Sequence, residues 1–314
     1  MPSSTFTLQG DIPINLKDTL TAQEYESILQ RSDLHGWWFV FCNYVITAAL
    51  FALMAIWTNP LTILLGVILL GGRQLGFGVI VHECGHGTMF NSRKLNDFVG
   101  EWLAAPTTFN NMKAYARGHL AHHKLAGTRE DPDLPNYQDY PITRSRLRRK
   151  LWRDFSGQTG WKQTQGIFRS FARFNDLSSE ARLALIRGLV FNLLLLGLLT
   201  ATGTPWLYIV WWAAMLTSNR VVARLRQVAE HANVPDLYDM DPRRNTRTVP
   251  AGWFDRLVFC PMGVNYHLEH HILASVPVYN LPMLHRLLMQ KGCYDGVDFP
   301  TSYFSMLRGV TTSG

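Results

Sequence analysis

Four long stretches of this 314-residue chain are almost free of charge, and turns of two or three residues join them in pairs. A helix that crosses the hydrocarbon core of a bilayer needs about 17 to 25 mostly apolar residues. Buried helices of a soluble protein can imitate one such stretch, but hardly four with such short connections. We therefore expect an all-α integral membrane protein with two hairpins of transmembrane helices, at residues 36–57, 61–81, 183–202 and 206–222.

The second of these stretches contains Arg73 and Gln74. An arginine in the middle of a span costs at least a few kcal/mol, on the order of 3, unless it faces protein or a polar cavity. The alternative is a longer helix in which Arg73 lies near the membrane edge. The sequence leaves both possibilities open.

The placement of positive charge predicts the orientation. Of the 30 Lys and Arg residues, 16 lie within 82–182 and ten follow residue 219, whereas the turns at 59–60 and 203–205 contain none. Because cytoplasmic loops carry the excess of Lys and Arg, the N-terminus, the central segment and the C-terminus are all expected on the cytoplasmic side. Topology thus accounts for the net charge of +7, and a nucleic-acid partner is not needed.

The rest of the chain is expected to form a cytoplasmic N-terminal segment (1–35) and a helical cytoplasmic body within a single membrane domain (36–314). The polar N-terminal segment lacks a basic start followed by an apolar core, so a cleaved signal peptide is not expected. The spacing of Thr21 and Glu24 is that of a capping box and predicts a helix that runs to about Arg31. The four scattered cysteines include no CxxC pair and are expected to be reduced thiols.

Nine of the 11 histidines form a pattern. Residues 82–86 read HECGH, 119–123 read HLAHH and 267–271 read HLEHH, while His231 follows the fourth apolar stretch. Residues at i, i+3 and i+4 share one face of a helix, so each box directs its imidazoles to one place. Imidazole is the commonest side-chain ligand of metals. The sequence therefore predicts a metal centre on the cytoplasmic face, and only His35 and His285 are left out of it.

The number of imidazoles indicates two metals. Nine exceed the four ligands of one zinc ion or the six of one octahedral ion. Nitrogen ligands with room for an exogenous ligand suit iron that reacts with O2. Two other classes remain as alternatives: a membrane zinc protease, because His82-Glu83-x-x-His86 is also an HExxH motif, and a non-catalytic protein that binds haem or metal.

The three boxes, in this order around two membrane hairpins, resemble the membrane fatty acid desaturase family, and bacterial acyl desaturases most of all. The similarity extends from about Leu61 to Leu288 and includes the runs 122–134, 226–231, 245–248 and 265–271. The resemblance implies a non-haem di-iron centre whose ligands are His82, His86, His119, His122, His123, His231, His267, His270 and His271. It also implies a water-mediated contact from Gln227. The first box departs mildly from the commoner His-Asp start, and Glu83 is either a carboxylate that orients an imidazole or a solvated helix residue.

The same resemblance implies the reaction and its partners. The enzyme would use O2 and two external electrons to introduce a C=C bond into a fatty acyl or lipid-like chain, in a bacterial inner membrane. A di-iron hydroxylase of a lipid or small amphiphile is the alternative, because both reactions share ligands and oxidant. The chain has no fused cytochrome, CxxCxxC run or GxGxxG fold, so a ferredoxin, rubredoxin or cytochrome donor is expected. The basic run 144–150 is either its dock or a contact to lipid headgroups.

Overall fold

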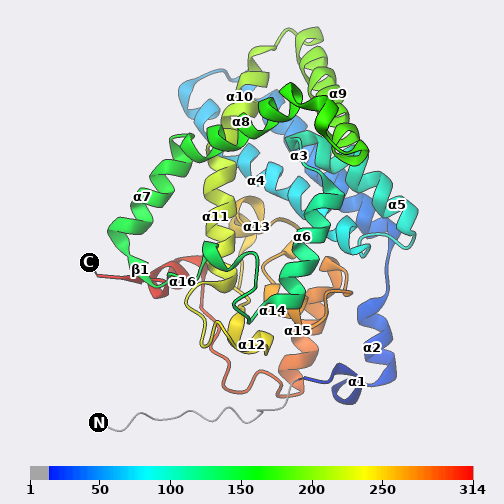
Figure 1. Ribbon diagram of the computed structural model, residues 1–314, viewed down its shortest axis with the longest axis vertical. Helices are drawn as coiled ribbons and strands as arrows, with labels where there is room; N and C mark the ends of the chain where they lie inside the picture. The colour runs from blue at the N-terminus through cyan, green and yellow to red at the C-terminus, as the bar shows by residue number, and fades with distance from the viewer. Residues whose placement is uncertain (1–13, 314) are drawn as a thin grey trace.

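A computed structural model describes residues 14–313 of the chain, and the architecture is mostly helical (Figure 1). The first 13 residues of the expected N-terminal segment lie outside the described range. The α-helices of the N-terminal half are α1 (Leu16–Thr19), α2 (Ala22–Leu29), α3 (Asp33–Ile56), α4 (Pro60–His86), α5 (Arg93–Phe98), α6 (Met112–Leu125) and α7 (Arg144–Phe155). Those of the C-terminal half are α8 (Gln158–Ala172), α9 (Ser179–Ala201), α10 (Trp206–Leu216), α11 (Ser218–His231), α12 (Pro242–Asn245), α13 (Trp253–Val258), α14 (His267–Ile272), α15 (Leu281–Gln290) and α16 (Tyr303–Gly309).

Short elements complete the chain. A π-helical turn (Val99–Ala104) runs into a 3-10 turn (Ala105–Thr108), and further 3-10 turns lie at Leu134–Asn136, Phe174–Asp176, Pro261–Gly263 and Val278–Asn280. Two strands, β1 (Ile142–Thr143) and β2 (Thr311–Thr312), pair in parallel and tie the start of α7 to the C-terminal end of the chain.

Three helical segments are long and apolar enough to cross a membrane: Ala22–Ile56, Pro60–His86 and Ser179–Ala201. Their outward faces are strongly apolar, with Phe41, Leu194 and Leu198 each more than half exposed. Large exposed apolar surfaces of this kind are typical of contact with lipid. Together with the polar remainder of the chain, the three helices indicate an integral membrane protein.

The fourth expected span is not one continuous helix. Helix α10 ends at Leu216 after 11 residues, and α11 begins at Ser218 after a break at Thr217, whose φ of −118° and ψ of −86° are not helical. The Thr217 hydroxyl donates to the carbonyl of Ala213 at 2.6 Å, a type of bond that often bends helices. The expected stretch 206–222 thus corresponds to α10 and the first turn of α11.

Helix α4 lies at the centre of the bundle and packs against α3, α6, α10, α11 and α13. Small residues permit this close packing, since a Cβ atom added at Gly71 would lie 2.3 Å from the Ser218 hydroxyl of α11. Arg73 is buried, and its guanidinium donates to the backbone carbonyl of Leu257 in α13. It therefore faces protein, the first of the two possibilities left open by the sequence.

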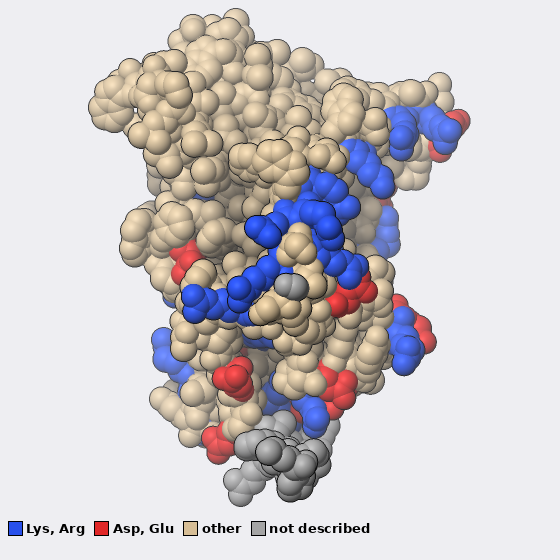
Figure 2. All heavy atoms as spheres, turned by 90° about the vertical axis from the view of Figure 1, so that its left-hand side faces the viewer, with Lys and Arg blue, Asp and Glu red and all other residues tan. Residues whose placement is uncertain are grey.

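Charged side chains are unevenly distributed on the face shown in Figure 2. The top and upper left of this face show no Lys, Arg, Asp or Glu, a small charged group lies at the upper right, and a band of Lys and Arg crosses the middle. Helix α7, which carries the basic run 144–150, lies on this side of the molecule. Trp152 and Phe155 of the same helix are exposed, as on an amphipathic helix at a membrane surface.

Two smaller expectations are confirmed. Helix α2 begins with the Thr21 capping box: the Thr21 side chain accepts from the backbone N–H of Glu24, and the Glu24 carboxylate accepts from the backbone N–H of Thr21. All four cysteines are free thiols.

Candidate metal centre

Four helices that are far apart in the sequence bring the nine patterned histidines together. The C-terminal end of α4 carries His82 and His86, α6 carries the second box, α11 ends at His231 and α14 consists almost entirely of the third box. Gly87 ends α4 in the left-handed conformation (φ 72°), which glycine adopts without strain. All nine histidines predicted as ligands are thus in one region of the structure.

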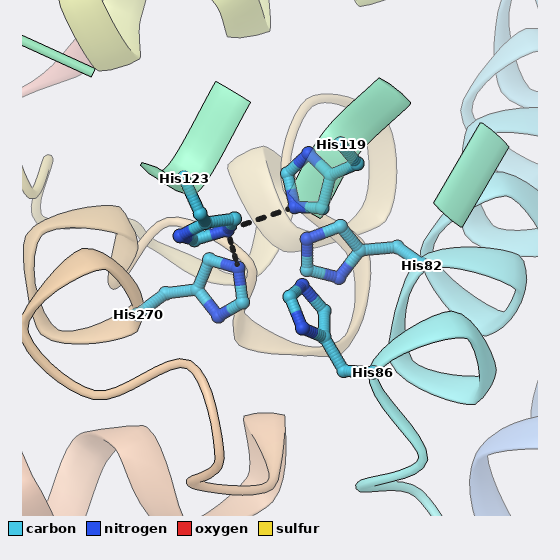
Figure 3. Close-up of side chains that lie close together, drawn as sticks. All are labelled: His82, His86, His119, His123 and His270. Atoms are coloured by element: carbon cyan, nitrogen blue, oxygen red, sulfur yellow. Dashed lines mark hydrogen bonds between the residues drawn. The ribbon is translucent and has the colours of Figure 1, made fainter. Parts of the chain in front are cut away.

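The nine side chains divide into two groups, and within each group one nitrogen per ring lies within 4.8 Å of all the others. We call them the five-histidine group and the four-histidine group. The five-histidine group is shown in Figure 3. Its members are His82, His86, His119, His123 and His270, and those of the four-histidine group are His122, His231, His267 and His271.

Each HxxHH box contributes to both groups. In α6, His119 and His123 belong to the five-histidine group and His122 to the four-histidine group, whereas α14 reverses the pattern and gives only His270 to the former. Residues at i and i+4 lie almost in line on a helix, and the residue at i+3 is displaced to one side. The spacing of one box therefore serves two adjacent sites.

In the four-histidine group, two rings contact hydrogen-bond acceptors through the nitrogen that points away from the centre of the group. The Nδ1 atom of His122 lies 2.8 Å from the Asp131 carboxylate, and Nδ1 of His231 lies 3.1 Å from the carbonyl of Asn245. A neutral imidazole that donates through Nδ1 presents the lone pair of Nε2 to the centre of the group. The Tyr137 hydroxyl donates to the other oxygen of Asp131 and holds that carboxylate in place.

In the five-histidine group the corresponding partner is Glu83. Its carboxylate lies 3.0 Å from Nδ1 of His82 and accepts from the Thr88 hydroxyl at 2.8 Å and from the backbone N–H of Val278 at 3.1 Å. Glu83 is fully buried, so it is not a solvated helix residue. Its contacts are those of a carboxylate that orients an imidazole.

The donor set fits the metals that such a pattern implies. The Nε2 atom of His123 lies 2.9 Å from Nε2 of both His119 and His270, and Nε2 of His267 lies 2.9 Å from Nε2 of His231. Within residues 14–313, the buried Nε2 atoms of His82, His86 and His271 have no hydrogen-bond partner. Converging nitrogen lone pairs suit a first-row transition metal.

For several of these rings burial favours the neutral form, which is the form that binds a metal. Desolvation, with a contribution from the neighbouring imidazoles, lowers the pKa of His123 and of His231 to about 3. The same causes hold the pKa of His270 and His271 well below its ordinary value.

A cavity of about 470 Å³ opens beside the four-histidine group between α6 and α11. Its lining includes His119, His122, His231 and His267, together with Gln227, one helical turn before His231. Gln227 therefore lines the same cavity as these histidines, and within residues 14–313 its side chain makes no hydrogen bond to an imidazole.

Sequence reasoning missed the carboxylates that support the third box and the second box. Glu269 is fully buried and accepts from the Tyr294 hydroxyl and from Nδ1 of His285, both at 2.6 Å. His285 thus lies outside both groups but contacts the third box. Asp131 was also missed, although it lies in the run 122–134 that carries the family resemblance. Its place in this run is the sequence signal by which it could have been predicted.

Comparison with known proteins agrees with this geometry. Residues 57–302 match the fatty acid desaturase family model. The chain is 25% identical to dihydrorhizobitoxine desaturase of Bradyrhizobium elkanii over 80% of its length and 74% of that protein. It is 25% identical to an sn-1 oleoyl-lipid 12-desaturase of Picosynechococcus over 89% of its length and 84% of that protein. It is also 26% identical to a beta-carotene ketolase of Paracoccus over 77% of its length and 86% of that protein.

The family match covers most of the chain and contains all nine clustered histidines. The HExxH motif lies within a five-histidine group and not in a zinc-protease site, so the protease alternative is not supported. On this evidence the chain belongs to the fatty acid desaturase family and is an oxidoreductase-type enzyme of that family.

Proposed function

We propose that the nine histidines bind two iron ions, one in each group, and that the enzyme uses O2 to introduce a C=C bond into a fatty acyl or lipid-like chain. The observation that carries the proposal is the division of the nine rings into a group of five and a group of four. One metal cannot use nine nitrogens, and two adjacent groups give each metal its own ligands.

Bound iron would supply the oxidising chemistry needed to remove hydrogen from an unactivated C–H bond, which amino-acid side chains do not provide. The protein supplies orientation. Asp131, Glu83 and the carbonyl of Asn245 fix the rings of His122, His82 and His231. The cavity between α6 and α11 holds the substrate beside them, so that a single pair of carbons lies within reach.

We also propose the membrane arrangement expected from the sequence, with residues 36–314 as one domain. Helix α10 and the start of α11 would serve as the fourth span, and both termini and the histidines would lie on the cytoplasmic side. This arrangement leaves the metal centre accessible to a soluble electron donor of the ferredoxin, rubredoxin or cytochrome type. The basic run on α7 serves either that donor or lipid headgroups.

Oxygen insertion is the second candidate function. It is favoured by the similarity to a protein named beta-carotene ketolase, which is not a desaturase by name. Desaturation and hydroxylation differ in whether the substrate radical loses a second hydrogen or takes up oxygen. This outcome depends on how the substrate is placed against the metals.

Anaerobic purification, metal analysis and incubation with O2, reductant and candidate lipids test the proposal. We expect close to two irons per chain and a product that has lost two hydrogens, detected by mass spectrometry. A product that has gained one oxygen atom would establish the hydroxylase. One tightly bound zinc ion and no activity after reconstitution with iron would contradict both.

Reporter fusions test the topology. A reporter that is active only in the cytoplasm should be active when fused after Ser156 and also when fused after Gly314. Activity at only one of these positions would show that the number of spans between them is odd, and that the proposed fourth span is wrong.

A further inference from the structure

The cavity beside the four-histidine group has a charged residue at its far end. Arg220 of α11 lines this cavity and also an adjoining cavity of about 300 Å³ between α8 and α10. Its guanidinium donates to two neutral oxygens, those of the Gln163 and Asn219 side-chain amides. Its Nε atom is buried and has no hydrogen-bond partner among residues 14–313.

The neighbouring arginines of α11 differ from Arg220. Arg224 binds the buried carboxylate of Asp154, with one contact of 3.0 Å, and Arg226 binds Glu230 at 2.5 Å. No ion pair is recorded for Arg220 in the described part of the chain, since the nearby Asp154 is already taken by Arg224. A half-buried guanidinium with only neutral partners is a favourable site for an oxyanion, because charge-assisted hydrogen bonds are the stronger ones.

The cavity has a mixed lining. Leu75, Ala114 and Ala223 supply apolar surface, and Arg226 and Glu230 line it as an ion pair. Asp133 also lines it, with its carboxylate 4.0 Å from Nδ1 of His122, and this charge disfavours a further anion near the histidines. Arg220 and His231 are eleven positions apart on α11, or about 16 Å at 1.5 Å per residue.

We propose that Arg220 binds the oxyanion of a single-chain amphiphile whose hydrocarbon part lies along α11 and reaches the histidines. This inference rests on the proposed function and names the substrate class for it: an amphiphile with a negatively charged end, held by that end. A carboxylate of the substrate and a phosphate of a membrane lipid have the same chemistry at this site, and the experiment below separates them.

The test is equilibrium binding without turnover. Radiolabelled dodecanoate is added to the iron-loaded protein in phosphatidylcholine nanodiscs, without reductant, and empty nanodiscs give the background. We expect saturable binding that unlabelled dodecanoate displaces at least about tenfold more effectively than dodecanol does. Nanodiscs that contain phosphatidylglycerol should leave the binding unchanged. Loss of dodecanoate binding in those nanodiscs would show that a lipid headgroup occupies the site and would overturn the assignment to substrate.

Two variants act on the positive charge of Arg220 in different ways. Arg220→Gln removes this charge. Gln163→Glu keeps it but gives the guanidinium a permanent carboxylate partner at an exposed position. Both should weaken dodecanoate binding by about tenfold to a hundredfold and leave dodecanol binding unchanged. Arg169→Gln, an exposed position on α8 outside both cavities, is the matched control and should bind as the wild type does.

Equal displacement by dodecanoate and dodecanol, or unchanged affinity in both variants, would overturn the proposal. Failure of this binding proposal can be distinguished from failure of the proposed function, because binding is measured without reductant and hence without turnover. A protein that binds dodecanoate through Arg220 but forms neither a desaturated nor a hydroxylated product would retain this site and lose the proposed reaction.

Discussion

The two histidine groups differ in what surrounds them. The five-histidine group takes its rings from α4, α6 and α14, and Glu83 is its orienting carboxylate among residues 14–313. The four-histidine group takes no ring from α4, and Asp131 and the Asn245 carbonyl accept hydrogen bonds from its rings. Three of its four histidines line the cavity. Five imidazoles nearly fill an octahedral coordination sphere, whereas four leave more room for another ligand. Under the proposed function, a metal held by the four-histidine group would therefore be the one nearer to a substrate in this cavity.

Loss of one ligand should have the largest effect and should distinguish the groups. His231→Ala reduces the smaller group to three rings, and His119→Ala reduces the larger group to four. We expect both variants to lose activity by more than the roughly hundredfold that loss of an outer partner costs. Iron per chain, measured by mass spectrometry, should fall further in His231→Ala. Equal iron content in the two variants would remove the distinction between the groups.

The carboxylates behind the rings should have the next largest effect. Asp131→Asn and Glu83→Gln preserve shape and remove the negative charge that holds His122 and His82. Such changes typically cost about 10- to 100-fold in metal affinity or activity, and we expect each variant to fall in that range. The measurements are iron content and product formation in membranes with matched protein levels. Wild-type values for Glu83→Gln would reassign that residue to a purely structural role.

Narrowing the cavity should reduce turnover and spare the metals. Gly118 lines the cavity on α6, and a Cβ atom added there meets no atom within 4 Å. Gly118→Leu should therefore fold, keep its iron and lower product formation by about tenfold, the size of effect expected when one productive substrate position is lost. Gly166→Leu is the control, because it also faces open space but lies on the exposed face of α8. Unchanged turnover in Gly118→Leu would place the substrate elsewhere.

The two unpatterned histidines should show the smallest effects, and they should differ from each other. The sequence alone predicts that both tolerate alanine. His285 contacts buried Glu269 at 2.6 Å, so its loss leaves a carboxylate oxygen with one partner fewer, at a cost of about 1–3 kcal/mol. We expect His285→Ala to lower the thermal unfolding midpoint by a few degrees. His35 is exposed, bonds half-buried Ser32 and stacks on Tyr279, and we expect no such shift for His35→Ala. Equal unfolding midpoints for the two variants would support the prediction from sequence that both positions tolerate alanine.

The clustered histidines and the long apolar helices could be predicted from the sequence because their signals are local. Periodic spacing within one helix places His119, His122 and His123 on one face, and hydropathy over about 20 residues marks a span. The predicted ligands all lie in the two groups, and three of the four predicted spans are long apolar helices. The prediction of a fourth span did not include the break at Thr217. A hydroxyl that donates to a backbone carbonyl of the preceding turn can bend a helix without changing the hydropathy of the segment.

Tertiary structure alone decided how the nine histidines are divided between the two groups and which side chains support them. Nothing in the spacing of a box says that His122 joins a different group from His119, because that depends on where α4, α11 and α14 pack around α6. Likewise, Asp131 and the Asn245 carbonyl become partners of histidines only when loops fold back onto the helices. Local sequence determines which face of a helix a side chain occupies, and the packing of distant segments determines what that face meets.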